Sequence, residues 1–92
     1  MTIKEIQAER RNDYGDPKNG FGDIAKLWSV YIKRKYNLGD DVPLDATDVA
    51  VMMVLMKTAR FAFKRKEDTA LDLSSYADFV WNFTKEKQCL KN

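Results

Sequence analysis

Apolar side chains recur along this chain every three or four residues, and clusters of turn-forming residues divide the pattern into four segments. The first segment covers residues 3–13 and opens on a capping box, in which the Thr2 hydroxyl and the Glu5 carboxylate satisfy free amides of the first turn. The second covers residues 21–36. No segment alternates apolar and polar residues with a period of two. The pattern therefore predicts an all-helical fold, a four-helix bundle.

Two breaks in the pattern are expected to be loops. Residues 14–20 collect turn-forming side chains, and Gly15 is placed to end the first helix in a left-handed conformation. Residues 37–43 end the second helix. The third helix then begins with Asp45 as its N-cap and Asp48 in its first turn, where a carboxylate stabilises the free amides.

The third helix is apolar on every side over residues 49–56. Such a helix is expected to be surrounded, either by the other helices or by a second subunit. Three short neighbours give little cover, so we expect a homo-oligomer that completes the bundle. Asp68 is expected to cap the fourth helix. Its predicted buried face consists of Leu71, Leu73, Tyr76, Ala77, Val80, Trp81 and Phe83.

Charged side chains of the last two helices match in a way that predicts an antiparallel hairpin. Lys57 and Arg60 lie on one stripe of the third helix, and Asp72 and Tyr76 lie on one stripe of the fourth. A turn near Lys66 would pair Arg60 with Asp72 and Lys57 with Tyr76. The same side chains either hold the hairpin together or form the wall of a site for a charged ligand, and the pattern leaves both interpretations open.

The composition excludes several classes of function. The 92 residues, 45% of them hydrophobic, make one domain, and 33% charged residues sum to a net charge of only +2, which disfavours nucleic acid as a partner. The chain has no histidine, and Cys89 is its only cysteine. A disulfide framework and an imidazole-assisted nucleophile are therefore excluded. With no apolar run long enough to span a bilayer and a single cysteine, we expect no membrane and a location in the reduced cytoplasm.

Carboxylates one helical turn apart are candidate ligands for Mg2+, which prefers oxygen. Asp68 and Asp72 form one such pair and Asp45 and Asp48 another. The two pairs lie about 25 to 30 Å apart along the third helix, so a single chain does not bring them to one metal. Each pair has an alternative reading as ordinary helix-start residues.

Cations near aromatic side chains are candidates for binding a nucleotide. Arg60 offers a planar fork to a phosphate and Lys57 a point charge. Arg11 and Tyr14 flank the tight backbone at Gly15, where a cation and an aromatic ring can meet a phosphate or a base. The alternatives are a structural bridge from Arg60 to Asp72 and a packed Tyr14.

The chain resembles a family of short, all-helical phage and prophage proteins of unassigned function, whose pattern is similar to that of MazG-like nucleoside triphosphate pyrophosphatases. The residues that carry the resemblance are Arg11, Tyr14, Gly15, Phe21, Ile24, Ala25, Trp28, Lys57, Arg60, Asp68, Asp72, Tyr76 and Ala77. The resemblance implies a dimer or tetramer that uses Mg2+ to split a nucleotide between its α and β phosphates. It implies a Mg2+ site at Asp72 and Asp68 and nucleotide contacts by Lys57, Arg60, Arg11, Tyr14 and Tyr76.

The chain departs from the enzymes at one place. Lys57 and Arg60 stand where the enzymes carry their first acidic cluster, and two cations with one carboxylate suit the binding of an anion better than the activation of water. The sequence therefore predicts a nucleotide-binding protein, with Mg2+-dependent pyrophosphatase activity as an open question and no catalytic residue assigned. The alternative is a non-enzymatic phage protein that sequesters a nucleotide signal or binds and inhibits a host protein.

Overall fold

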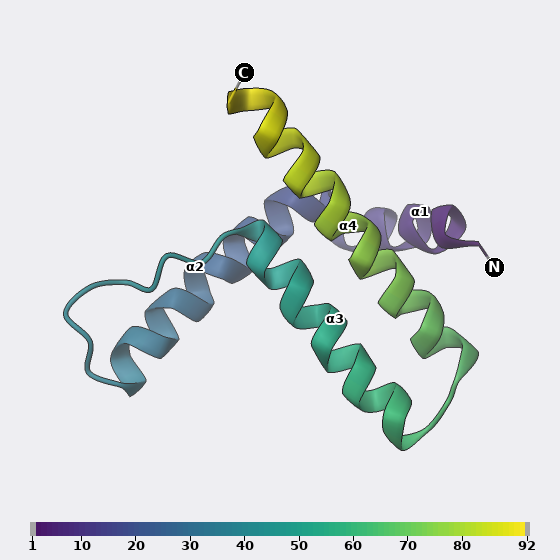
Figure 1. Ribbon diagram of the computed structural model, residues 1–92, viewed down its shortest axis with the longest axis horizontal. Helices are drawn as coiled ribbons and strands as arrows, with labels where there is room; N and C mark the ends of the chain where they lie inside the picture. Colours follow the sequence, from purple (N-terminus) through teal and green to yellow (C-terminus); the bar gives the residue numbers. More distant parts are fainter. Residues whose placement is uncertain (1, 92) are drawn as a thin grey trace.

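In a computed structural model that describes the backbone of residues 2–91 and the side chains of residues 2–86, the chain folds into four helices, with no strand in that range (Figure 1). The helices are α1 (Ile3–Tyr14), α2 (Pro17–Lys35), α3 (Ala46–Phe63) and α4 (Glu67–Lys91). The prediction of an all-helical fold with four helices is confirmed. Its MazG-like character and its completion by oligomerisation stay predictions.

The helices form a flat and open arrangement rather than a closed bundle. α3 and α4 run antiparallel as the predicted hairpin and make the main packing interface of the chain (Figure 1). α2 packs on α3 and projects away from the hairpin as an arm, and α1 lies against α4. The chain measures 44 × 38 × 23 Å along its principal axes. Much of α3 is therefore left without a neighbour.

Capping side chains determine where α1 and α3 begin, as the sequence predicts. Thr2 and Glu5 form the expected capping box, and Asp45 and Asp48 form a second one at the start of α3. Gly15 ends α1 with a φ of 81°, a value that favours glycine, and its amide donates to the carbonyl of Arg11. Each of these caps depends on residues that lie close together in the sequence, and the structure contains each of them.

The start of α2 differs from the prediction, because the helix begins at Pro17 instead of Phe21. Asp16 is its N-cap, and the Asp16 carboxylate accepts a hydrogen bond of 2.9 Å from the amide of Lys18. Proline is favoured at the first helical position, where its missing amide costs nothing. The expected loop is thereby reduced to Gly15 and Asp16.

The connection between α3 and α4 also differs. α3 ends at Phe63 and α4 begins at Glu67, so the connector consists of residues 64–66. Asp68 lies inside the first turn of α4 rather than at the expected N-cap position. A carboxylate in the first turn still complements the positive end of the helix dipole, so Asp68 keeps this stabilising interaction although α4 begins earlier than predicted.

An aromatic cluster joins α2 to α4. The ring of Phe21 lies 6.0 Å from that of Tyr76, 5.6 Å from that of Phe79 and 6.0 Å from that of Phe83. Trp81, predicted to be buried, is 63% exposed, because side chains two residues from Phe79 and Phe83 point to the opposite side of a helix. The core is small, and its buried apolar residues in the described range are Ile6, Ala25, Val49, Ala50 and Phe83.

Candidate functional site

A cleft of about 470 Å3, here called the central cleft, is lined by side chains from all four helices. α1 contributes Arg10 and Tyr14, and α3 contributes Lys57. α4 contributes Asp72 and Tyr76. Phe21, Phe79 and several aliphatic side chains form the apolar part of the wall. The structure thus brings together four residues that the sequence nominates: Tyr14, Lys57, Asp72 and Tyr76.

Asp72 is the centre of the charged group in this cleft. Its Oδ2 lies 2.9 Å from Lys57 Nζ, and its Oδ1 lies 3.7 Å from Arg10 Nη2. The side chains of Asp72 and Lys57 are only 15% and 14% exposed, whereas Arg10 is 47% exposed. Two cations thus share one carboxylate, and Asp16 is a second carboxylate in the lining of the cleft.

Arg60 does not make the predicted bridge to Asp72. The ion pairs of Asp72 in the described residues are those with Lys57 and Arg10, and Arg60 is exposed. The three-residue connector shifts the pairing of the two helices by about one turn, so Lys57 takes the place expected for Arg60. Arg60 remains near enough to the cleft to lower the pKa of Tyr76 slightly against larger opposing effects.

Arg10 is the residue of this cleft that sequence reasoning missed. The signal for it exists in the spacing, because Arg10 follows Ile6 by four residues and therefore shares its face of α1. Ile6 is 8% exposed, so that face points into the molecule. A cation on the buried face of an amphipathic helix needs a partner, and Asp72 provides it.

Tyr76 and Tyr14 are the aromatic residues with hydroxyl groups in the cleft, and their exposure differs. Burial raises the pKa of Tyr76 above its ordinary value of 10.0, and the nearby Asp72 charge raises it further. Arg10 acts in the opposite direction on the same pKa. Tyr14 is 75% exposed and stands at the last position of α1. The cleft therefore has one tyrosine ring in its wall, beside Phe21 and Phe79, and the other tyrosine ring at its mouth.

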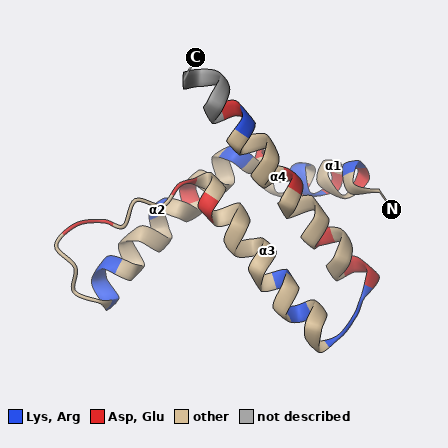
Figure 2. Ribbon diagram, viewed as in Figure 1, with Lys and Arg blue, Asp and Glu red and all other residues tan. Residues whose placement is uncertain are grey.

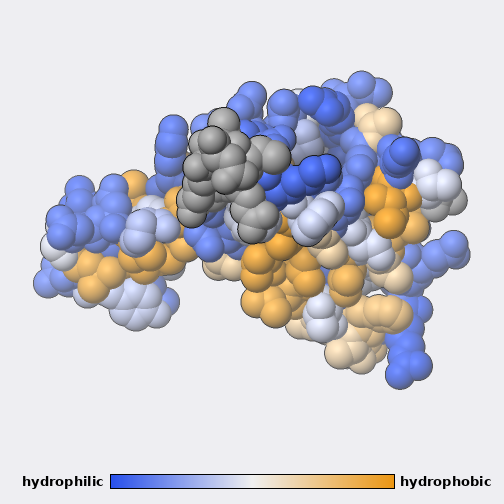
Figure 3. All heavy atoms as spheres, turned by 45° about the horizontal axis from the view of Figure 1, so that its top comes forward, coloured by the Kyte–Doolittle hydropathy of each residue, from blue (hydrophilic) through white to orange (hydrophobic). Residues whose placement is uncertain are grey.

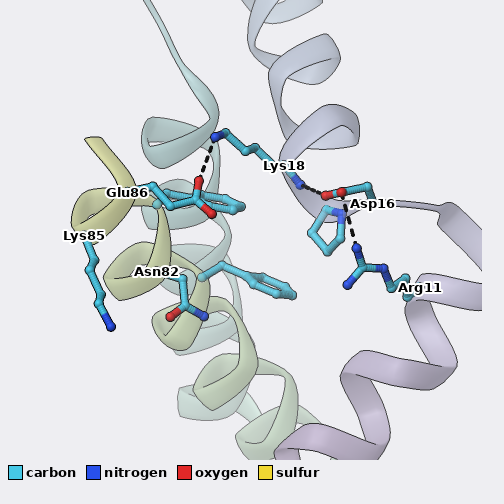
Figure 4. A pocket seen from close by; sticks show the side chains of 9 residues that line it. Arg11, Asp16, Lys18, Asn82, Lys85 and Glu86 are labelled. Carbon is cyan, nitrogen blue, oxygen red and sulfur yellow. Dashed lines mark hydrogen bonds and ion pairs between the residues drawn. The ribbon is translucent and has the colours of Figure 1, made fainter. Parts of the chain in front are cut away.

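A second cleft of about 670 Å3, the outer cleft, holds Arg11, which the sequence places with Tyr14 (Figure 4). Arg11 Nη2 lies 3.3 Å from Asp16 Oδ2, and Lys18 Nζ lies 2.6 Å from Glu86 Oε2. Asp16, Pro17 and Phe79 line both clefts, so the start of α2 separates them. The predicted site residues Arg11 and Tyr14 thus lie in different clefts.

The carboxylates of the described residues do not gather into a cluster of metal ligands. No group of three or more ligating side chains gathers in that part of the chain. Asp68 is exposed at the start of α4 and does not line the central cleft. Both oxygens of Asp72 face cations, which compete with a metal for the same lone pairs. The expectation of Mg2+ stays a prediction.

Comparison with known proteins places the chain in a family. A family model described as "Domain of unknown function (DUF6378)" matches residues 2–83. The chain belongs to this family. This DUF6378 chain is 42% identical over 78 residues to the Gene 55 protein of Mycobacterium phage L5 and 34% identical over 82 residues to the Gene 55 protein of Mycobacterium phage D29.

The two alignments cover 83% and 88% of the DUF6378 chain but only 46% and 49% of the relatives. The chain thus spans about half the length of the curated relatives that it matches. No solved structure matches it. The expected relation to a short phage family is confirmed, whereas the relation to MazG-like enzymes stays a prediction. Among the described residues, no helix is both long enough and apolar enough to cross a membrane.

Proposed function

We propose that the central cleft binds a nucleotide and that it does so without turning it over. The observation that carries the proposal is the convergence of Arg10 and Lys57 on one carboxylate beside two tyrosine rings. Arg10 is half exposed and 3.7 Å from Asp72, so its guanidinium is free to turn to a phosphate. Lys57, at 2.9 Å and nearly buried, keeps Asp72 neutralised when Arg10 turns away.

The exposed ring of Tyr14 supports a nucleotide rather than a simple phosphate. A base stacked on an exposed aromatic ring gains about 1 to 3 kcal/mol. Tyr14 is within the same cleft as Arg10, four residues away on α1, so one helix presents a cation and an aromatic ring on neighbouring turns. A ligand with a phosphate group and a planar heterocycle satisfies both.

The state of the carboxylates favours binding over hydrolysis. Asp72 and Asp16 are the carboxylates that line the central cleft. Asp72 is held by Lys57 and Arg10, and Asp16 is held by the amide of Lys18 and the guanidinium of Arg11. A general base directs a carboxylate oxygen at the attacking water, whereas each carboxylate oxygen of Asp72 and Asp16 already faces a cation or an amide. Sequestration of a nucleotide signal therefore fits these side chains better than pyrophosphatase chemistry.

Arg10, Tyr14, Lys57 and Asp72 line one cleft, so the proposal is tested by the affinity of the protein for nucleotides. The experiment is calorimetry with a panel of nucleoside triphosphates and cyclic nucleotides, with and without Mg2+, together with measurement of released pyrophosphate. Binding without release supports sequestration, and Mg2+-dependent release would establish a pyrophosphatase instead. Absence of binding at millimolar ligand would refute the proposal and direct the search to a host protein.

Two variants locate the ligand. Arg10→Gln is expected to weaken nucleotide binding at least tenfold through loss of a charge-assisted contact. The matched control is Arg34→Gln, which replaces an exposed arginine at the C-terminal end of α2. Tyr14→Ala is expected to weaken nucleotide binding but not the binding of inorganic pyrophosphate, which has no ring to stack.

A further inference from the structure

The accessible surface of the chain is larger than that of an average folded monomer of its mass. The chain exposes 7075 Å2, whereas a monomeric protein of 10.7 kDa is expected to expose about 5,500 Å2. The excess is about 1,600 Å2 for the whole chain, and the projecting α2 arm supplies part of it. Stable homodimers bury about 1,000 Å2 or more on each subunit. The excess surface is therefore of the size that a second copy of the chain would cover.

α3 and the α2 arm carry most of the large apolar side chains on this surface, and the longest run of them is on α3. Exposed side chains on one side of the helix form a surface here called the α3 face, which consists of Val51, Met52, Leu55, Thr58, Ala59, Ala62 and Phe63. Leu55 is 63% exposed and Phe63 is 94% exposed. In Figure 3 hydrophobic side chains, in orange, form a group at the centre of the molecule and smaller groups on its left and right sides. The single polar member, Thr58, donates its hydroxyl to the carbonyl of Val54, so the face presents no charged group.

The α3 face is complementary to itself when two copies run antiparallel. Its larger side chains stand near the start of the helix and its smallest ones near the end, apart from Phe63. When the two-fold axis of the dimer crosses α3 at the level of Lys57, Leu55 of one copy stands at the level of the partner's Ala59. Met52 likewise stands at the level of the partner's Ala62. Large side chains then fill the space beside small ones, which lets the two helices approach closely.

Charge supports the same orientation. α3 begins with Asp48 in its first turn and ends with Arg60, followed by the cationic residues of the connector (Figure 2). An antiparallel pair puts the acidic start of one helix beside the basic end of the other, and it also opposes the helix dipoles. A parallel pair would put like charges together at both ends.

We propose that two copies of the chain form a homodimer through antiparallel packing of their α3 faces. The proposal goes beyond nucleotide binding and does not rest on it, because Lys57 and Met53 point from the opposite side of α3 into the central cleft. The occupant is a second copy rather than another protein, since the excess area, the pairing of side-chain sizes and the charge pattern are all satisfied by the same two-fold arrangement.

The first experiment is the mass in solution by sedimentation equilibrium at micromolar concentration. The expected result is about twice 10.7 kDa, and a monomeric mass would overturn the proposal. Leu55→Glu is expected to give a monomer with the helical content unchanged, because Leu55 is already exposed in the single chain. Leu38→Glu, at a 43% exposed site outside α3, is the matched control and should remain a dimer. A dimeric Leu55→Glu or a monomeric Leu38→Glu would contradict the assignment to the α3 face.

The orientation is tested by cross-linking, which also covers the case in which Leu55→Glu fails to fold. Met52→Cys and Ala62→Cys are placed in separate chains that carry Cys89→Ser and are co-expressed. In the antiparallel dimer two copies of residue 52 are separated by about 15 Å along the helix axes, whereas residue 52 is level with the partner's Ala62. A short bismaleimide should therefore cross-link Met52→Cys to Ala62→Cys in the co-expressed sample. It should not cross-link a sample that contains only one of the two variants. Efficient linking of Met52→Cys to itself would overturn the antiparallel arrangement.

Discussion

Replacing Lys57 by methionine removes the closer of the two cations that hold Asp72 while keeping an unbranched side chain of similar length. The pair has a separation of 2.9 Å between Nζ and Oδ2, and both side chains are about 15% exposed. Breaking a fully buried ion pair from one side costs about 3 to 5 kcal/mol. Because water reaches both groups slightly and Arg10 remains 3.7 Å from Asp72, we expect Lys57→Met to lower the free energy of unfolding by about 2 kcal/mol.

The assay is urea unfolding followed by circular dichroism at one fixed protein concentration, since association would add to the apparent stability. Arg60→Met is the matched control and should change the free energy of unfolding by less than about 0.5 kcal/mol, because Arg60 is exposed. The double variant Lys57→Met with Asp72→Leu should regain most of the loss, since an apolar pair replaces a buried ion pair at little cost.

The outcome that refutes this reasoning is a Lys57→Met variant as stable as Arg60→Met. In that case the pair contributes nothing measurable, and Lys57 and Asp72 are only neighbours. A larger loss for Arg60→Met than for Lys57→Met would instead restore the pairing that the sequence predicts.

Two further results are expected. Gly15→Ala should lower the free energy of unfolding by about 1 to 3 kcal/mol, because its φ of 81° and ψ of −160° strain any side chain. At both Gly15 and Gly20 an added Cβ would meet no atom within 4 Å, so crowding does not distinguish the two sites. Gly20→Ala, inside α2, should leave the free energy of unfolding unchanged or raise it. Equal melting temperatures for the two variants would contradict this contrast. The raised pKa of Tyr76 means that the unfolded chain loses this proton first, so stability should fall as the pH rises above about 10, and Tyr76→Phe should reduce that fall. An identical pH dependence of unfolding in both proteins would show that Tyr76 does not titrate abnormally.

Features with a short-range cause were predictable from the sequence. The capping boxes at Thr2 and Asp45 and the turn at Gly15 each depend on residues within three positions, and the structure has all three. The start of α2 was equally predictable, because aspartate followed by proline favours an N-cap and the first helical position. It was mistaken for a loop because aspartate and proline also favour turns.

The partners of charged residues were harder to predict, because they depend on the register between helices. A connector centred near Lys66 predicts Arg60 beside Asp72, whereas the observed connector, residues 64–66, pairs Lys57 with Asp72. The centre of the turn thus lies between residues 64 and 65 instead of at residue 66, and this shift moves the partner of Asp72 by three residues, nearly one helical turn. The contact from Arg10 joins residues 62 positions apart in the chain, and only the packing of α1 on α4 brings them together.

Several sides of α3 have a packing or binding role, which limits the substitutions that this helix can accept. Within one chain this helix packs on α4 with one side, meets α2 with another and supplies Lys57 to the central cleft with a third. The outer part of α2, by contrast, leaves Leu27, Val30 and Tyr31 exposed. A saturation mutagenesis library should therefore retain few substitutions along α3 and many along the α2 arm.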